Sequence, residues 1–412
     1  MTWLSSRNEQ EDTSRLINTF SFALYEELKG GDGSLFVSPF SISTCLAMAY
    51  GGARGKTARQ MADVLGFPLD QNYLLEALGN LLKDLSDDTE ERAYQFLVAN
   101  AMWGQKGYPF SPKYIELLAV KYGSEINAVD FETQPEVTCQ AINQWVRENT
   151  QNKITNIIQP LQLDPLTRLL LTNAVYFKGK WEVPFDEHLT ILSPFKMKSG
   201  ASETAEVDVA MMKQDAWFKY MDNETFQALE LPYQGQELSM LILLPREMDG
   251  LSDFQTSLTE KNLSSWVRKL QYIDVELTLP KFRFTSEFSV GGLLQTMGMK
   301  DAFDQATADF SGIAEGKDLF LWGILHKAFV DVNEEGTEAA AVTGVAMGLA
   351  EPDLDVPPPK IFCADHPFFF LIRHIASGTI LFMGRISDTV GLVQVLPALE
   401  AEDNLLKLEG PN

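Results

Sequence analysis

The hydrophobic pattern of the chain is typical of helices in its first third and of strands thereafter. Near the start, one apolar face repeats every four residues, at Leu16, Phe20, Leu24 and Leu28. That spacing predicts an amphipathic helix. Another helix is predicted over residues 42–50, because this apolar stretch follows Ser38-Pro39, a capping residue and a proline suited to a first helical turn.

Strand patterns dominate the remainder of the chain. Residues 169–177 and 238–244 are nearly continuous apolar runs, as expected for strands covered on both faces. Residues 275–279 alternate between apolar and polar, which is typical of a half-exposed strand. The last strong apolar runs are 368–372 and 379–383. Helices followed by strands predict a large α+β domain rather than a series of β-α-β units.

The length of 412 residues would ordinarily indicate two or three domains. No internal repeat is present, and no linker rich in Gly, Pro or Ser divides the first 330 residues. The 27 residues that follow Arg385 (412 − 385) mix acids with leucines. We expect most of this last segment to form a loosely attached tail.

The chain is strongly acidic, with 57 Asp and Glu against 33 Lys and Arg and a net charge of −24. Nucleic acids and anionic membranes require clustered basic residues, so neither is expected as the main partner. No run approaches the roughly 18 apolar residues of a membrane span.

The three cysteines, Cys45, Cys139 and Cys363, are too few and too scattered for a disulfide framework. Buried free thiols in a reducing compartment are the simpler interpretation. The first residues contain no apolar stretch of signal-peptide length. We therefore expect a cytoplasmic protein, or a secreted one if a leader has been removed from the chain.

The enzymatic signals in the sequence are weak. Residues 51–57, GGARGKT, resemble a phosphate-binding loop, but Tyr50 stands where that motif needs glycine and a helical pattern precedes it instead of a strand. A helix C-terminus with glycine stops is the better interpretation. The histidines lack the spacing of a zinc site: His188, His326, His366 and His374. No Gly-x-Ser-x-Gly motif is present, so we expect no catalytic residue, cofactor or metal.

Residues 331–356, DVNEEGTEAAAVTGVAMGLAEPDLDV, are unusual for a loop. A charged start with Gly336 leads into small apolar residues, and acids and three prolines follow. If the run formed a strand, one face would carry only small or β-branched side chains: Thr337, Ala339, Ala341, Thr343 and Val345. Such a strand fits a crowded sheet without displacing large side chains. Composition alone leaves this possibility almost even with a flexible loop or an Ala-rich helical turn.

Residues 333–341, NEEGTEAAA, resemble the hinge of the reactive-centre loop in the serpin family. The likeness covers about residues 12–388. Other family motifs occur along the chain in the family's order, at residues 36–41, 173–181, 231–233, 279–282, 309–313, 326–328 and 365–368. So many ordered motifs make the resemblance specific. Ser34 and the pair Trp322-Gly323 depart from the family pattern.

The resemblance implies an α+β serpin fold of three β-sheets and eight or nine helices, with an exposed reactive-centre loop at about residues 334–359. It assigns residues 1–390 to a single serpin domain and leaves residues 391–412 as a C-terminal tail, which we expect to be loosely ordered. Many serpins are suicide-substrate inhibitors of serine proteases. The protease cuts the loop and forms an acyl-enzyme, and the cut loop then inserts as a new central strand of the largest sheet. The expected partner is therefore a target serine protease in a covalent 1:1 complex.

The resemblance also assigns roles to individual residues. The loop hinge comprises Glu334, Glu335, Gly336, Thr337, Glu338, Ala339, Ala340 and Ala341. The shutter beneath the opening sheet comprises Ser38, Ser41, Asn173 and His326. Without the resemblance, Ser38 would be read as a helix cap and His326 as a core histidine. Trp181 matches the breach, at the top of that sheet, where insertion begins. The hinge has small residues that insert without overpacking, so we expect an inhibitory member.

Family spacing places the specificity residue 14 positions after Gly336, at Ala350, with Glu351 across the scissile bond. Leu349 and Met347 are alternatives, because the loop is several residues longer than in common family members. A small residue suits elastase-like or subtilisin-like proteases, whereas Leu349 would suit chymotrypsin-like ones. No Arg or Lys lies from Gly336 to Pro359, so trypsin-like targets are not expected.

Other functions stay open at this point. A non-inhibitory serpin that acts as a binding or carrier protein is the main alternative, and an NTPase that uses Lys56 is a minor one. Glycosaminoglycan activation is not expected, because residues 84–91, near the family's binding helix, are acidic. We expect a monomer, although an inserting strand that enters a neighbour's sheet would make polymerisation a hazard.

Overall fold

The computed structural model describes residues 2–31, 33–86, 94–199, 203–316, 318–337 and 357–394. Within these residues the chain forms nine α-helices: α1 (Thr2–Leu28), α2 (Pro39–Gly52), α3 (Gly55–Leu65), α4 (Gln71–Ser86), α5 (Pro112–Tyr122), α6 (Pro135–Asn149), α7 (Leu251–Thr256), α8 (Glu260–Lys269) and α9 (Val290–Met297). Both helices predicted from the pattern are present. Phe20 and Leu24 of α1 are buried in the core, and the Ser38 hydroxyl caps α2 by accepting a hydrogen bond from the Ser41 N–H.

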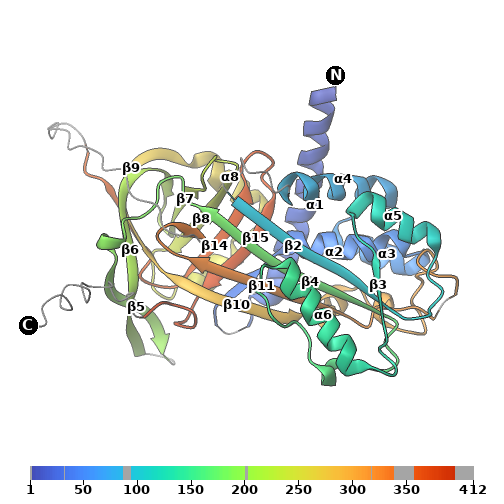
Figure 1. Ribbon diagram of the computed structural model, residues 1–412. Helices are drawn as coiled ribbons and strands as arrows, with labels where there is room; N and C mark the ends of the chain where they lie inside the picture. Colours follow the sequence, from blue (N-terminus) through green and yellow to red (C-terminus); the bar gives the residue numbers. More distant parts are fainter. Residues whose placement is uncertain are drawn as a thin grey trace, which may run out of the picture.

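A six-stranded sheet crosses the middle of the molecule (Figure 1). Its order is β10 (Phe282–Ser289), β11 (Gly323–Val332), β12 (Gly336–Thr337), β4 (Leu169–Lys180), β2 (Tyr94–Gln105) and β3 (Ile126–Val129). Helix α6 lies across the front of this sheet (Figure 1), and a separate hydrophobic cluster joins Ile142 and Val146 of α6 to Tyr176 and Phe329 of the sheet. The predicted strand at 169–177 lies in β4 and is buried throughout, because both its faces are covered.

A nine-stranded sheet forms the strand-rich end of the molecule. Its order is β1 (Leu35–Val37), β15 (Ile380–Ile386), β14 (Phe368–His374), β8 (Leu238–Pro245), β7 (Phe226–Pro232), β6 (Glu203–Asp222), β9 (Gln271–Pro280) and β13 (Lys360–Cys363), and β5 (Ile191–Ser199) also pairs with β6. The resemblance implies three sheets, but two of them are joined here. The reason is the 20-residue strand β6, which pairs with β5 near its start and with β7 at its end. The predicted α+β class is confirmed.

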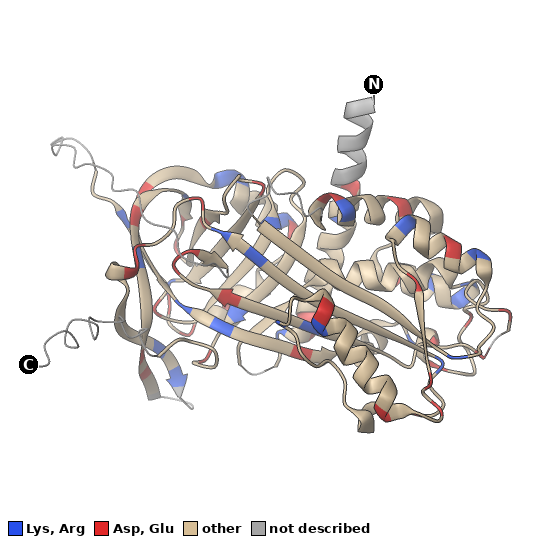
Figure 2. Ribbon diagram, in the orientation of Figure 1, with Lys and Arg blue, Asp and Glu red and all other residues tan. Residues whose placement is uncertain are grey.

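The charge is distributed over both ends of the fold. Acidic residues lie on the helices at one end and on the strands at the other (Figure 2). No helix in the described part of the chain is long and apolar enough to cross a membrane.

The first residues of the predicted tail are attached to the sheets. Gly391 O accepts a hydrogen bond from Arg283 N at 2.7 Å, and Val393 N donates one to Lys281 O at 3.0 Å. Leu392 between them is only 6% exposed. The chain is therefore held against the start of β10 as far as Val393, and residues 395–412 lie outside the described part.

Truncation tests how far the stable domain extends. A chain that ends at Val390 is expected to lose about 3 kcal/mol of unfolding free energy relative to one that ends at Gln394, because it lacks the buried Leu392 side chain and its flanking hydrogen bonds. Urea unfolding of both truncated chains measures the difference. Equal midpoints would mean that residues 391–394 add nothing to the domain.

Candidate functional site

The six-stranded sheet is open at one end, and a short strand occupies the opening. Strands β11 and β4 pair directly, in parallel, between residues 323–329 and 170–176. Above this stretch they separate, and β12 lies between them. Gly336 pairs with Lys180 of β4, and Thr337 pairs with Gly179 of β4 on one side and with Val332 of β11 on the other. Gly336 and Thr337 of the predicted hinge thus already occupy a strand position in the sheet.

Gly336 is required at this position by its close contact with β4. A Cβ atom on Gly336 would lie 2.0 Å from Gly179 O and 2.7 Å from Lys180 Cα, and the backbone has a φ of +156°. Backbone atoms cannot move aside as a flexible side chain could. Any side chain at 336 would therefore push β12 out of the sheet.

Two stacked aromatic rings hold the backbone of the hinge. The Trp181 ring stacks on Tyr233, with centroids 4.6 Å apart. The indole Nε1 donates to Asn333 O at 3.0 Å, and Trp181 N donates to Glu335 O at 2.9 Å. The Tyr233 hydroxyl bonds the Thr337 hydroxyl at 2.8 Å. Trp181, which the resemblance places at the breach, therefore lies where the hinge enters the sheet.

A buried ion pair fixes the start of the hinge. Lys281 Nζ lies 2.6 Å from Glu334 Oε2, and the two side chains are 13% and 6% exposed. The Thr190 hydroxyl donates to Glu334 Oε1 at 2.7 Å, and Phe185 N donates to Glu334 O at 2.8 Å. The lysine and the threonine satisfy a carboxylate that would otherwise be costly to bury, and the bond from Phe185 holds the backbone of Glu334.

The four residues assigned to the shutter form one buried hydrogen-bonded cluster under the closed part of the sheet. Asn173 donates to Ser41 O at 3.0 Å and faces the ring nitrogen Nδ1 of His326 through its side-chain oxygen. Ser38 N donates to His326 Nε2 at 3.4 Å, and the Ser38 hydroxyl donates to Leu381 O at 2.7 Å. Because α2 supplies the serines, β4 supplies Asn173 and β11 supplies His326, the cluster joins the two strands to the helix behind them.

Asn100 belongs to this cluster but was not predicted. Its side-chain oxygen accepts from Asn173 Nδ2, and its own Nδ2 donates to the Thr44 hydroxyl at 2.9 Å. An asparagine in the middle of the apolar run 96–102 is unfavourable in a strand unless it is bonded. A polar residue within an apolar strand was therefore the feature from which a role for Asn100 could have been predicted.

His326 makes the cluster sensitive to acid. Burial lowers the pKa of His326 from 6.5 to about 3, so the ring is neutral in the folded state. The unfolded chain takes up the proton first as the pH falls. The stability that this group contributes is therefore complete above pH 6.5 and is lost progressively toward pH 3.

We expect His326→Gln to weaken the dependence of stability on pH. Glutamine can still donate to Asn173 and accept from Ser38, but it does not titrate. Between pH 6.5 and 4.5 the free energy of unfolding of the wild type should fall by up to about 1.4 kcal/mol more per pH unit than that of the variant. Urea unfolding at pH 7.5, 6.0 and 5.0 measures the two slopes, and the carboxylates common to both proteins cancel in the comparison. Identical slopes would contradict a titrating role for His326.

Another contact connects α6 to the sheet. Lys327 Nζ bonds Asn156 O at 2.7 Å and Glu287 Oε2 at 2.6 Å, and the lysine side chain is 11% exposed. Asn156 lies in the segment that follows α6. The segment after α6 is therefore tied to β10 and β11, and β11 is one of the two strands between which β12 lies.

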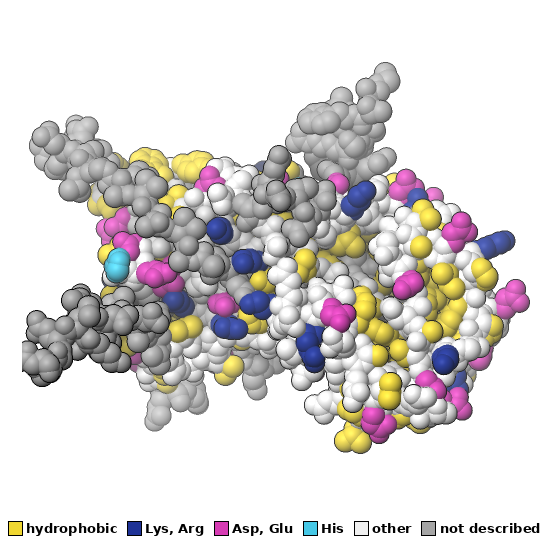
Figure 3. All heavy atoms as spheres, in the orientation of Figure 1, with side chains coloured by type: hydrophobic (Ala, Val, Ile, Leu, Met, Phe, Trp, Pro, Cys, Tyr) yellow, Lys and Arg dark blue, Asp and Glu magenta, His cyan; other side chains and the backbone are white. Residues whose placement is uncertain are grey.

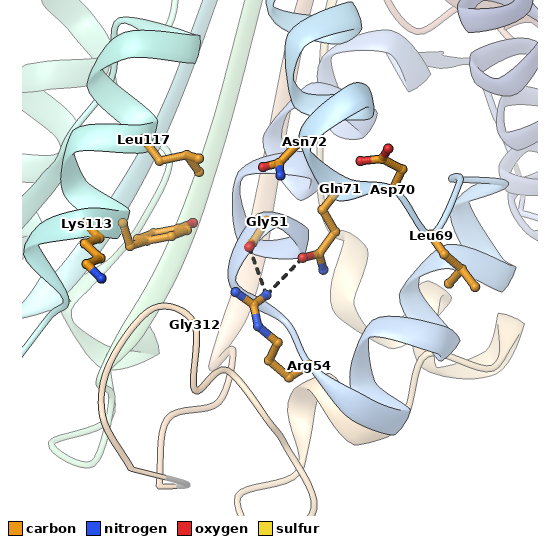
Figure 4. Close-up of a pocket in the computed structure, with 10 residues that line it drawn as sticks. Gly51, Arg54, Leu69, Asp70, Gln71, Asn72, Lys113, Leu117 and Gly312 are labelled. Carbon is orange, nitrogen blue, oxygen red and sulfur yellow. Dashed lines mark hydrogen bonds between the residues drawn. The ribbon is translucent and has the colours of Figure 1, made fainter.

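The glycine-rich segment 51–57 has a structural role. Helix α2 precedes it, and the Arg54 guanidinium bonds Gly51 O, Ala53 O and Gln71 Oε1, which caps the end of α2 and joins it to α4. Figure 4 shows Gly51, Arg54 and Gln71 on one side of a cavity of about 410 Å³, with Lys113 and Leu117 of α5 on the other. Lys56 pairs with Asp301 at 3.2 Å. The interpretation as a helix C-terminus is confirmed. Within the described residues, no cluster of three or more His, Cys, Asp or Glu side chains could hold a metal.

Several predicted site residues lie outside the described part of the chain. They are Glu338, Ala339, Ala340 and Ala341 of the hinge, and Met347, Leu349, Ala350 and Glu351 around the expected reactive bond.

Comparisons with known proteins agree with the motifs. A family model described as Serpin (serine protease inhibitor) matches residues 15–389. A serpin-like protein of Thermococcus kodakarensis is 41% identical over 380 residues, which cover 92% of this chain and 86% of the relative. The human leukocyte elastase inhibitor is 37% identical over 365 residues, 86% of this chain and 93% of that one. Human thyroxine-binding globulin has a TM-score of 0.82 at 28% identity, over 93% of this chain and 100% of that chain. The family match and the identity of these relatives over most of their length show that this chain belongs to the serpin family of serine protease inhibitors.

Proposed function

We propose that this serpin traps serine proteases as a suicide substrate. One observation carries the proposal: β12 lies between β4 and β11, in the position of a new central strand. Continued insertion would lengthen a strand that has already begun, and it would separate β4 from β11 along residues 170–176 and 323–329, starting at the end that β12 already holds open.

The proposed chemistry begins as ordinary proteolysis. The protease serine oxygen attacks the carbonyl carbon of Ala350, the bond to Glu351 N breaks, and the new amine leaves with the proton from the serine. An ester then joins the protease to Ala350 in a covalent 1:1 complex. Insertion of the freed loop would carry the protease along the sheet before water hydrolyses this ester.

The dimensions of the sheet are adequate for that movement. From Gly336 to Ala350 there are 14 residue steps, or roughly 46 Å at the rise of a strand. Strand β4, which would flank the inserted loop, is 12 residues long and extends from Lys180 at the opening to Leu169 at the other end of the sheet. The protease would therefore be moved to the far end of the sheet.

The loop sequence favours targets with a small specificity pocket. Ala350 suits elastase-like or subtilisin-like enzymes, and the relative named leukocyte elastase inhibitor supports the first class. Cleavage after Leu349 or Met347 would instead indicate a pocket for larger apolar residues.

A carrier function is the alternative. The likeness to human thyroxine-binding globulin supports it, because that protein has the same fold and its name states a ligand. The small residues of the hinge favour inhibition, since a carrier does not need a loop that can insert.

The test is incubation of the full chain with leukocyte elastase, subtilisin, chymotrypsin and trypsin. We expect a complex that survives boiling in SDS with elastase or subtilisin and none with trypsin. The mass of the released C-terminal peptide identifies the bond that is cut. Cleavage of the loop without a stable complex, and without a rise in melting temperature, would exclude trapping and favour the carrier function.

A further inference from the structure

We propose that the outer face of β6, β9 and β13 is a second docking surface for the target protease, and that it binds basic side chains beside the protease active site. The proposal rests on the protease inhibition proposed above and goes beyond it by naming where, apart from the loop, the partner is held.

Large apolar side chains are strongly exposed on this face: Trp217 is 65%, Tyr272 61% and Ile361 66% exposed. The strand registers place them together. Trp217 lies opposite Asp274, and Ile361 lies opposite Glu276. Residues 272, 274 and 276 occupy alternate positions of β9 and therefore share a face. Figure 3 shows hydrophobic side chains at the surface of the end where β9 lies.

The two aromatic rings border a groove. Trp217 and Tyr272 line a space of about 180 Å³ together with Glu182 and Pro232. Exposed tryptophan and tyrosine are the residues most enriched where protein partners bind, because each buries a large rigid area.

Three acidic residues lie beside Trp217 on this face. Asp215 lies directly opposite Glu276 across β6 and β9, with Asp274 at the next position of the same face. Like charges in such a pair destabilise a sheet, so the arrangement is unfavourable for the isolated protein. Among the nearby cations, Lys213 lies opposite Thr278, and Lys219 lies opposite Tyr272, with its Nζ 5.9 Å from the centre of that ring and 3.2 Å from Glu230. Lys360 of β13 pairs with Asp222 at 3.6 Å. The Trp217 ring is therefore the one that a partner's cation would use.

Rings beside carboxylates are suited to arginine and lysine. A guanidinium or ammonium group of the partner can lie over the Trp217 ring and pair with a neighbouring carboxylate at the same time. The partner that fits this face therefore carries exposed basic side chains next to apolar ones.

The location fits a protease that is cutting the loop. Strand β13 starts at Lys360, ten residues after the proposed specificity residue Ala350 (360 − 350), and it pairs with β9. Ten residues extend to about 35 Å at most, which is close to the width of a small domain. A protease seated at Ala350 can thus reach β13 and β9.

The experiment measures the second-order rate constant of inhibition for whichever of leukocyte elastase, subtilisin and chymotrypsin the wild type traps fastest. The variants are Trp217→Ala/Tyr272→Ala on the proposed surface, Asp274→Asn/Glu276→Gln beside it, and Val120→Ala as the control. Val120 is 73% exposed on α5, at the other end of the molecule (Figure 1). All four proteins are compared at 50 and 300 mM NaCl.

We expect the aromatic double variant to react at least about tenfold more slowly, with an unchanged stoichiometry and an unchanged SDS-stable complex. The Asn/Gln variant should lose most of the salt dependence, and Val120→Ala should match the wild type. Equal rate constants for all proteins, with trapping intact, would overturn the docking surface and leave the proposed function standing. Failure of the wild type to trap any protease would overturn the proposed function and this proposal with it. A dimer of the wild type that the aromatic variant abolishes, with unchanged rate constants, would assign the face to a second copy instead.

Discussion

Thr337→Arg is expected to make this serpin a substrate of the protease that we propose it traps. Thr337 is fully buried between β4 and β11, and its hydroxyl contacts Tyr233. An arginine at this position would have to bury a guanidinium without a partner, at a penalty of several kcal/mol, or keep β12 out of the sheet. Insertion would then become slower than hydrolysis of the acyl-enzyme. We expect more than about ten molecules of the variant to be cut for each protease trapped, from titration of elastase activity and from SDS gels.

Thr337→Val is the matched control. Valine has nearly the same shape and loses only the hydrogen bond to Tyr233. It should lower the free energy of unfolding by about 1 kcal/mol and leave the number of serpin molecules consumed per trapped protease close to the wild-type value. Both variants should be cleaved at the wild-type rate, because residue 337 is 13 positions from Ala350 (350 − 337). A stable complex at near-equal stoichiometry with Thr337→Arg would contradict the proposed role of β12 as the start of insertion.

The shutter residues were predicted from the family motifs, and two of them also conflict with their local pattern. Asn173 interrupts a run of nine residues that is otherwise mostly apolar, and His326 stands inside another strand. A polar group inside a buried strand must be bonded, so such positions attract attention even before a fold is known. Asn100 is also a polar residue inside an apolar strand. It was not predicted because residues 96–102 match none of the family motifs.

The parts that could not be predicted depend on partners far away in the chain. The position of β12 is fixed by pairing Gly336 with Lys180, which are 156 positions apart (336 − 180). Periodicity reports which face of a segment is buried, but it does not identify the strand beside it. The same limit applies to Leu392, whose burial follows from hydrogen bonds to the start of β10 and not from any pattern in its own short segment.

The ion pair between Glu334 and Lys281 is expected to be the most sensitive point of the native state. Glu334→Lys would place two ammonium groups in a site where both side chains are nearly buried, and would remove the acceptor of the Thr190 hydroxyl. Loss of one partner of a buried pair costs about 3–5 kcal/mol, and repulsion between the two lysines adds to it. The backbone bonds of Glu334 and Glu335 to Phe185 and Trp181 would be strained, so β12 should leave the opening.

An opening without β12 exposes the unpaired edges of β4 and β11. A strand from a second molecule can then enter, so we expect the variant to form polymers as well as to lose more than about 4 kcal/mol of unfolding free energy. Urea unfolding measures the stability, and size-exclusion chromatography after incubation at 37 °C measures the polymers.

Reversal of the pair separates electrostatics from packing. Lys281→Glu alone should be about as damaging as Glu334→Lys, whereas Glu334→Lys/Lys281→Glu restores opposite charges and should recover more than half of the lost stability. Recovery remains partial because Thr190 donates to the carboxylate at position 334 in the wild type, and a carboxylate moved to position 281 would lose that bond. If the double variant is no more stable than the sum of the two single losses predicts, the ion pair does not hold the hinge, and the stacked rings of Trp181 and Tyr233 must carry that role.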